Sequence, residues 1–220
     1  MKKFLIGIIL SISGNVYAAC TDLYPPHLVI PKLENTVELC NSFFVSIFDT
    51  NNRAVIVVSE RLTDHDNVGT VNRINAFHAD NRLNYKAPVS ADYRRSNYDK
   101  GHMAPAADAA NRAQMYETFL MSNITPQEPT LNRNSWKELE ESTRKQFAKV
   151  KGDMYILNIA IYHPKAKRIG GGIPVPAGYW KIVYVGNEVR HFYADNKPHA
   201  KVKEVSAVNV SRLIKNAQNF

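Results

Sequence analysis

The strongest constraint on this fold comes from short runs of β-branched and aromatic residues that end at turn-forming residues. Residues 43–48 and 55–58 are two such runs, joined by an Asp-Thr-Asn-Asn stretch. Residues 179–185 and 189–193 are a second pair, joined by a Gly-Asn turn. Short apolar runs on either side of a turn are typical of antiparallel hairpins.

Helical periodicity appears between and after these hairpins. It predicts helices over 104–120, 136–150 and 202–214, and a further strong strand is expected over 155–162. A Ser-Trp-Lys-Glu capping box at 135–138 marks the expected start of the second helix. Hairpins mixed with separated helices predict an α+β fold with a mainly antiparallel sheet.

Residues 63–98 form a long polar stretch without a clear period. A loop of that length on a compact domain usually carries function. The three glycines at 170–172 lack the spacing of a nucleotide-binding loop and indicate a turn. We find no internal repeat or low-complexity segment, so residues 19–220 are predicted to form one domain.

The first 18 residues have the pattern of an export signal. Lys2 and Lys3 precede an apolar run at 4–12, which is shorter than the roughly 20 residues of a membrane span. Val16 and Ala18 fit a signal-peptidase site. We therefore expect a signal peptide over 1–18 and a periplasmic or secreted mature chain without stable membrane association.

Export would place both cysteines in an oxidising compartment. A Cys20–Cys40 disulfide, closing a loop of about 20 residues, is the simplest outcome. Lipid modification of Cys20 is the alternative, because Ala18-Ala19-Cys20 resembles a lipoprotein box. Tyr17 stands where that box has Leu, and lipidation would leave Cys40 unpaired.

The charge balance favours an anionic partner. Lys and Arg number 28 against 20 Asp and Glu, which gives a formal net charge of +8. That excess fits nucleic acid, acidic lipid or polyanionic sugar and does not choose among them. The chain lacks a phosphate-binding glycine loop, a dinucleotide fingerprint, His-Glu-x-x-His and Gly-x-Ser-x-Gly.

A histidine between charged residues is the first candidate for chemistry. His102 follows Asp99, Lys100 and Gly101 and stands just ahead of Pro105 and an expected helix start. Taken alone, a histidine near a helix terminus is more often structural than catalytic. The neighbouring acid and base nevertheless suit general-base chemistry.

Four polar and aromatic residues at intervals of four are the second candidate. Asn132, Trp136, Glu140 and Arg144 would share one broad face of a helix. Whether Asn132 lies inside the first helical turn or just before it stays open. A solvated face with a Glu140–Arg144 ion pair is the alternative to a functional stripe.

Together these two segments resemble the DNA/RNA non-specific endonucleases, a family of ββα-metal nucleases. The family signature is Asp-Arg-Gly-His, an Ala-Pro segment, Ser-Asn-x-x-Pro-Gln, Leu-Asn, and then Trp with Leu-Glu. The same order occurs here over roughly 43–220, which implies the family's ββα-metal motif within the α+β fold. The matching residues are Asp99, Gly101, His102, Ala104, Pro105, Ser122, Asn123, Pro126, Gln127, Leu131, Asn132, Trp136, Leu139 and Glu140.

The resemblance implies roles for three residues around a metal ion. His102 takes the place of the general base that activates water. Asn132 takes the place of the one protein ligand of a single Mg²⁺, for which Mn²⁺ is the expected substitute. Glu140 matches the carboxylate that holds a metal-bound water. A cation with one amide oxygen and several waters suits Mg²⁺.

The remaining catalytic residues implied by the family surround the phosphate and the base. Arg144 matches an arginine that contacts the phosphate, and Asn123 matches an asparagine near the base. Asp99 and Lys100 belong to the signature itself. Lys100 replaces the usual Arg and loses its bidentate fork, which puts the turnover rate in question.

Further arginines are expected to bind the substrate. The family's N-terminal hairpin often supplies one, for which Arg53 is nearby, and Arg94 and Arg95 could substitute for it. The resemblance thus implies an exported, Mg²⁺-dependent endonuclease with DNA and RNA as substrates. Little sequence preference is expected because the contacts engage the backbone, and the family leaves 5′-phosphate ends.

Two other functions stay open from the sequence. The first is a catalytically impaired nucleic-acid-binding protein on the same scaffold, for which Lys100 is the only support. The second is a basic binder of acidic glycans or lipopolysaccharide, which explains charge and export but leaves the paired motifs unexplained. A homodimer also stays open.

Overall fold

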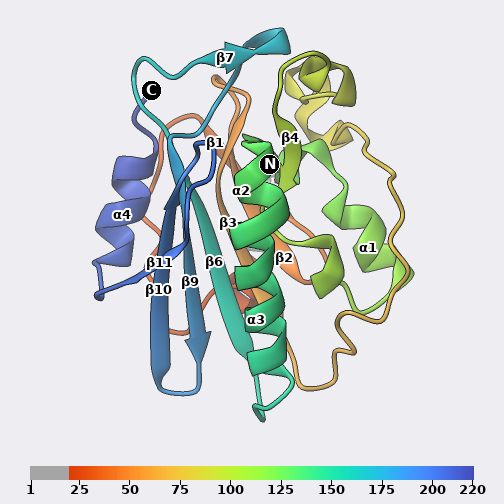
Figure 1. Cartoon of the computed structure of the whole chain (residues 1–220), viewed down its shortest axis with the longest axis vertical. Helices are drawn as coiled ribbons and strands as arrows, with labels where there is room; N and C mark the ends of the chain where they lie inside the picture. The colour runs from red at the N-terminus through yellow and green to blue at the C-terminus, as the bar shows by residue number, and fades with distance from the viewer. Residues whose placement is uncertain (1–19) are drawn as a thin grey trace, which may run out of the picture.

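A seven-stranded antiparallel sheet forms the centre of the computed structural model, which describes residues 20–220 (Figure 1). The predicted signal peptide over 1–18 lies outside the described residues. The predicted α+β class is confirmed. In spatial order, the strands are β1 (Thr36–Cys40), β2 (Phe44–Asp49), β3 (Ala54–Leu62), β6 (Met154–Ile161), β9 (Gly178–Val185), β10 (Glu188–Asp195) and β11 (Lys203–Val205).

Small hairpins and helices surround this sheet. A π-helical turn over 132–136 joins two of the helices into one continuous segment, which crosses in front of the sheet in Figure 1. The elements are β4 (Asp99–His102), β5 (Ile124–Gln127), β7 (Arg168–Ile169), β8 (Ile173–Pro174), α1 (Arg112–Thr118), α2 (Pro129–Leu131), α3 (Lys137–Phe147) and α4 (Val210–Ala217). Short 3₁₀ turns occupy Thr21–Leu23, Asn81–Lys86, Ser90–Tyr93, Ala106–Asp108, Met121–Asn123 and Gly170–Gly172.

Both predicted hairpins are confirmed. β2 pairs with β3 across a turn in which Oδ1 of Asp49 accepts hydrogen bonds from the backbone N–H groups of Asn51 and Asn52, each at 2.8 Å. β9 pairs with β10 across Gly186, whose φ of +55° is the left-handed conformation that this tight turn requires. The predicted strand over 155–162 is β6.

The helix predicted over 104–120 is wrong in extent. Within 104–120, only the part that forms α1 is α-helical. The side chain of Asn111 accepts a hydrogen bond from the backbone N–H of Gln114 at 3.0 Å and starts the helix there. The Ala-rich stretch ahead of it is extended or 3₁₀ in conformation and packs into the core, with Ala104 and Ala109 fully buried. Small side chains suited core packing as well as they suited a helix.

The helix predicted over 202–214 is shifted toward the C-terminus. The side chain of Asn209 caps α4 by accepting from the backbone N–H of Arg212 at 2.9 Å. Residues 203–205 instead extend the sheet as β11, paired with β10. Pairing with β10 through backbone hydrogen bonds stabilises the extended conformation of these residues more than their weak helix propensity stabilises a helix.

The helix predicted to begin at residue 136 begins at Pro129 instead. Glu128 caps it, since its Oε2 accepts from the backbone N–H of Leu131 at 2.8 Å. The predicted capping box at Ser135 is wrong, because the Ser135 hydroxyl donates to the carbonyl oxygen of Ala200 at 2.8 Å. Asn132 therefore lies inside the helical segment.

The two faces of the central strands meet different surroundings. Successive side chains of β3 point to opposite faces. On one face, the Ser59 hydroxyl donates to the carbonyl oxygen of Leu23 at 2.6 Å. The predicted disulfide between Cys20 and Cys40 is present and ties this N-terminal segment to β1. Glu60 points to the other face, where its Oε1 accepts from Nδ2 of Asn158 at 2.5 Å. Within residues 20–220, no helix combines the length and apolarity needed to cross a membrane.

Candidate active site

The pairing of β4 with β5 and the helix that follows them brings most of the predicted site residues together. His102 lies opposite Ile124 in this antiparallel pair, and Gly101 lies opposite Thr125. Gly101 allows a close approach, because a Cβ at this position would lie 2.5 Å from Cβ of Gln127. The chain then enters the α2–α3 segment directly, which completes a ββα arrangement.

A cavity of about 430 Å³ opens between β4 and this helical segment. Its lining contains five residues of the predicted catalytic and metal set: Lys100, His102, Asn132, Glu140 and Arg144. Arg73, Arg133, Lys137 and Glu141 also line it. The two sequence motifs thus meet at one cavity.

His102 is held as a neutral ring. Its centroid lies 5.4 Å from that of Phe77 and 4.8 Å from that of Phe119. Burial, reinforced by the positive charges of Arg73 and Lys100, lowers the pKa of His102 to about 3. Nε2 is buried and has no hydrogen-bond partner among residues 20–220. Nδ1 is therefore the ring nitrogen that can exchange a proton with the cavity.

Asp99 fixes the orientation of Asn132. Nδ2 of Asn132 donates to Oδ2 of Asp99 at 2.9 Å, which leaves Oδ1 of Asn132 as the atom that can serve a cation. Arg133 donates to both carboxylate oxygens, at 2.8 and 2.6 Å. Burial opposes ionisation of Asp99, but the hydrogen bonds from Arg133 and Asn132 outweigh it and hold the pKa below its ordinary value.

Glu140 and Arg144 follow Asn132 along the same helical segment. Burial raises the pKa of Glu140 to about 7, against the lowering effect of Lys181 and Arg144. Nη1 of Arg144 forms an ion pair with Oδ1 of Asp108 at 2.8 Å. In the part of the chain that the structure describes, Arg144 forms its ion pair with Asp108 and not with Glu140, so the stripe is not the solvated face of the alternative interpretation.

A buried polar layer lies behind the cavity. Nζ of Lys181 donates to Oδ1 of Asn158 at 2.5 Å, and Nδ2 of Asn158 donates to Oε1 of Glu60 at 2.5 Å. Each of these residues is at most 1% exposed. Burial, together with Asp108, raises the pKa of Glu60 well above its ordinary value. The sequence signal for this layer was Lys181, a charged residue inside the otherwise apolar strand β9.

Arg73 is a cavity residue that the sequence reasoning missed. It lies in the long polar loop over 63–98, and its guanidinium carbon is 5.1 Å from the ring centroid of Phe119. Its charge lowers the pKa values of both His102 and Glu140. The loop was expected to be functional, but one arginine in a stretch without periodicity could not be singled out.

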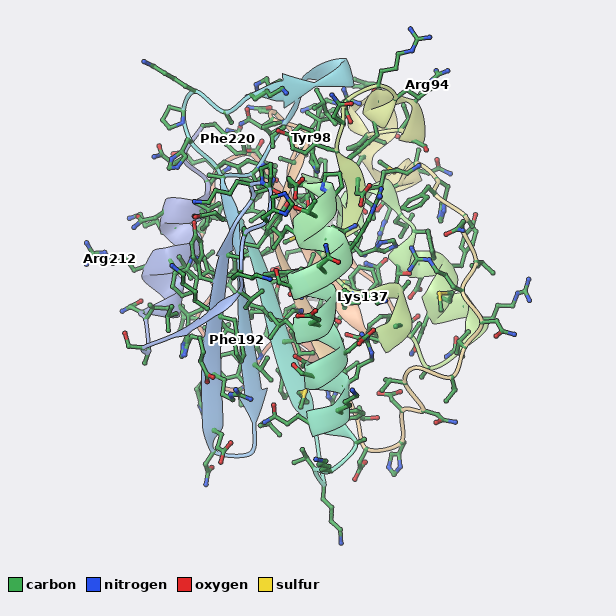
Figure 2. The ribbon with its side chains drawn as sticks, in the orientation of Figure 1. Arg94, Tyr98, Lys137, Phe192, Arg212 and Phe220 are labelled. Atoms are coloured by element: carbon green, nitrogen blue, oxygen red, sulfur yellow. A yellow bond between two sulfur atoms is a disulfide. The ribbon has the colours of Figure 1, made fainter. Side chains whose placement is uncertain are left out.

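The three arginines predicted to bind the substrate do not line the cavity. Nη2 of Arg53 forms an ion pair with Asp92 at 3.0 Å and donates to the carbonyl oxygen of Ala87 at 3.0 Å. That side chain therefore links the β2–β3 turn to the neighbouring loops. Arg94 and Arg95 are exposed, and Figure 2 shows Arg94 extending outward from the edge of the molecule. Arg73 is the arginine of the long loop that lines the cavity.

Asn123 lies behind the histidine and is fully buried. Its Oδ1 accepts from the backbone N–H of Ala104 at 2.8 Å. Its Nδ2 donates to the carbonyl oxygens of Ala104 and Thr118, each at 2.9 Å. These bonds fix the chain that follows His102. Asn123 does not line the cavity, and its catalytic role stays a prediction.

The oxygen donors of the cavity suit a hard cation that keeps most of its water. Asn132 offers an amide oxygen, and Glu140 offers a carboxylate from the same helical segment. Within residues 20–220, no group of three or more His, Cys, Asp or Glu side chains is arranged to hold a metal ion. A cation here would take its other ligands from water and substrate, which suits Mg²⁺ because it dehydrates reluctantly.

Comparisons with known proteins find similarity to nucleases over most of the chain. Residues 28–219 match the model of the DNA/RNA non-specific endonuclease family. Mitochondrial endonuclease G of Bos taurus is 28% identical over 174 residues, which is 70% of this chain and 58% of that protein. A nuclease of Serratia marcescens is 31% identical over 114 residues, which is 47% of this chain and 43% of that protein.

A solved structure of a similar protein has a similar fold. The structure of the EndoG/EndoGI complex contains a chain that matches with a TM-score of 0.67 and 26% identity, over 76% of each chain. The present chain spans 58% of the length of the bovine and human endonuclease G relatives that it matches.

Proposed function

We infer that this chain, which belongs to the DNA/RNA non-specific endonuclease family, hydrolyses phosphodiester bonds of DNA and RNA at the cavity that His102 lines. One observation carries this proposal. A neutral histidine, an oriented amide oxygen and a carboxylate share one cavity with the basic side chains of Arg73, Lys100 and Arg144. This set provides a base, donors for a metal ion and positive charge for a phosphate.

His102 acts as the general base. Its imidazole is uncharged near neutral pH, and with Nε2 buried, Nδ1 accepts the proton of the attacking water. Phe77 and Phe119 hold the plane of the ring. A bound phosphate offsets the charges of Arg73 and Lys100 and so raises the pKa of His102 when the substrate is present.

Asn132 and Glu140 would hold Mg²⁺, or Mn²⁺ in its place. Asn132 offers Oδ1 because Asp99 engages its Nδ2, and Glu140 would act through a bound water. When bound, such a cation would supply positive charge that polarises the phosphate and stabilises a leaving 3′ oxygen, as the proposed 5′-phosphate ends require. Asp99 acts as a positioning residue, since it touches Asn132 and not the reacting atoms.

Arg144, Arg73 and Lys100 provide fixed positive charge for the phosphate. Asp108 anchors Arg144 through one nitrogen and leaves the other N–H groups of the guanidinium for the substrate. Nζ of Lys100 donates to the Ser90 hydroxyl at 2.8 Å and lies 4.2 Å from the ring centroid of Phe77. Such contacts engage the backbone, so the enzyme would have little sequence preference.

The proposal extends to the compartment and to the domain. The Cys20–Cys40 disulfide supports an oxidising location, either periplasmic or secreted, reached through a signal peptide over 1–18. The family match over 28–219 supports one endonuclease domain over 19–220.

Digestion of supercoiled plasmid and of unstructured RNA by the purified protein tests this function. Both substrates should be cut in Mg²⁺ and in Mn²⁺, and neither should be cut in excess EDTA. A Glu204→Gln variant serves as the control, because this exposed side chain pairs with Arg190 and does not line the cavity, and it should retain full activity. Tight binding of both nucleic acids without cleavage in any metal would contradict the enzyme and identify a binding protein.

A further inference from the structure

A second hollow, of about 770 Å³, lies on the surface formed by the long loop and α1. Figure 1 shows this loop running along the outer side of α1. Aliphatic and aromatic surface predominates in the hollow, with one cation and one carboxylate at its wall. The lining residues are Ile74, Ala76, Arg112, Ala113, Tyr116 and Glu117.

The same two elements also form a wall of the candidate active site. Phe77 of the loop and Phe119, which follows α1, both contact the ring of His102. Arg73 lines the catalytic cavity, and its neighbour Ile74 lines the hollow. The catalytic cavity and the hollow therefore adjoin each other along residues 73–77.

Tyr116 presents a fixed aromatic surface in this hollow. Its ring stacks on His78, with centroids 4.1 Å apart and 19° between the planes. Nδ1 of His78 donates to the carbonyl oxygen of Ala76 at 2.6 Å, which holds the supporting ring in place. Tyr116 is still 49% exposed although one face is covered, so the opposite face is open to a ligand.

The chemistry of the hollow selects a flat, uncharged ring attached to an anionic chain. An exposed aromatic face stacks on any nucleobase, and Arg112 adds positive charge for the backbone. The Glu117 carboxylate is already engaged, since it accepts from the backbone N–H of Ser42 at 2.9 Å and from the Ser42 hydroxyl at 2.8 Å. Bases inside a duplex are stacked on their neighbours, so only an unpaired base could use Tyr116.

We propose that this hollow is a subsite that binds an unpaired base of the nucleic-acid strand being cut, with Tyr116 as the stacking platform. The proposal rests on the endonuclease function and adds to it a preference for single-stranded substrates. Tyr116 would contact the substrate away from the reacting atoms and would chiefly affect KM.

The test compares Tyr116→Ala with Tyr116→Phe on three substrates. These are a single-stranded DNA oligonucleotide, the same sequence as a duplex, and a single strand of abasic tetrahydrofuran units. Loss of the ring should lower kcat/KM on the normal single strand by about 10-fold, mainly through KM, because base stacking on an aromatic residue has roughly that effect. Duplex and abasic strands should be cut as by the unaltered protein, and Tyr116→Phe should behave normally on all three.

Tyr85→Ala is the matched control. Tyr85 is 89% exposed and lines a different cavity, beside β1, so its loss should leave all three rates unchanged. Equal losses of Tyr116→Ala activity on normal and abasic strands would overturn the subsite, as would an unchanged rate on the single strand.

A binding measurement separates this proposal from the proposed function. The affinity of His102→Ala for a fluorescent single strand is measured in EDTA, with and without Tyr116→Ala. The subsite predicts weaker binding of the normal strand in the double variant and equal binding of the abasic strand. Equal affinity of both variants for the normal strand would overturn the subsite even if the protein cuts nucleic acid. If the double variant binds the normal strand more weakly but the unaltered protein does not cleave nucleic acid, the subsite stands and only the endonuclease function is contradicted.

Discussion

The most informative single residue is His102, because burial keeps its imidazole neutral in a cavity that basic side chains also line. Its pKa of about 3 in the folded chain is far below the ordinary value of 6.5. The unfolded chain therefore binds more protons at this position between pH 6.5 and about 3. The contribution of His102 to stability is thus constant above pH 6.5 and is lost as the pH falls below that value.

Chemical unfolding at several pH values tests this environment. Relative to His102→Gln, the unaltered protein should lose up to about 1.4 kcal/mol of unfolding free energy per pH unit below pH 6.5. His65→Gln is the control, since this side chain is 92% exposed and should leave the pH dependence unchanged. A difference between the unaltered protein and His102→Gln that stays constant from pH 7 to pH 4.5 would show that His102 is not buried as described.

Asp99 provides a prediction about the positioning of a metal donor. Asp99→Ala releases Nδ2 of Asn132 and frees its amide to rotate. The Mg²⁺ concentration for half-maximal cleavage should rise by about 10- to 100-fold, the usual effect of removing a residue that orients a metal ligand. A normal maximal rate at saturating Mg²⁺ is also expected. Glu204→Gln, which alters an exposed ion pair with Arg190, is the control. An unchanged Mg²⁺ requirement in Asp99→Ala would remove Asp99 from this role.

At the scale of elements, the β4–β5 pair depends on one glycine. In Gly101→Ala the new Cβ meets the Gln127 side chain, so we expect a loss of about 1–3 kcal/mol in unfolding free energy, as for other overpacked cores. The double variant Gly101→Ala/Gln127→Gly removes the opposing Cβ. Its loss of unfolding free energy should therefore be close to the loss caused by Gln127→Gly alone. Additive losses in urea unfolding would show that the two side chains do not collide.

The elements also show what the sequence could predict. Both hairpins and the strand over 155–162 followed from local pattern, because turn residues and β-branched runs act over a few positions. The helix ends at Asn111, Glu128 and Asn209 were missed, since each depends on one capping side chain that competes with a broader period. An Ala-rich stretch fits both a helix and a core, and only tertiary packing decides between them.

The candidate site was predictable to a similar extent. The resemblance over 99–144 selected five residues that the structure brings to one cavity. It could not find Arg73, whose place depends on the path of a long loop. It also suggested a substrate role for Arg53. The structure instead pairs Arg53 with Asp92, a residue far from it in the sequence. Contacts between distant loops are the part that local pattern does not contain.

At the scale of the whole molecule, the N-terminal segment stabilises the side of the sheet opposite to the buried polar layer. Its disulfide closes a loop of about 20 residues. Cys20→Ala/Cys40→Ala should therefore lower the unfolding free energy by about 3 kcal/mol. The cleavage rate at 25 °C should stay unchanged, because neither cysteine lines the catalytic cavity. Loss of activity in a variant that is still folded would show that the disulfide shapes the site.

The central claim is that one buried, neutral histidine activates water in a cavity that also holds the metal donors. Single-turnover cleavage of a labelled oligonucleotide by His102→Ala in saturating Mg²⁺, with binding measured in parallel, tests this claim most directly. We predict a rate at least about 100-fold below that of the unaltered protein, the usual effect of removing a general base, with an unchanged dissociation constant. A cleavage rate equal to that of the unaltered protein would contradict the account.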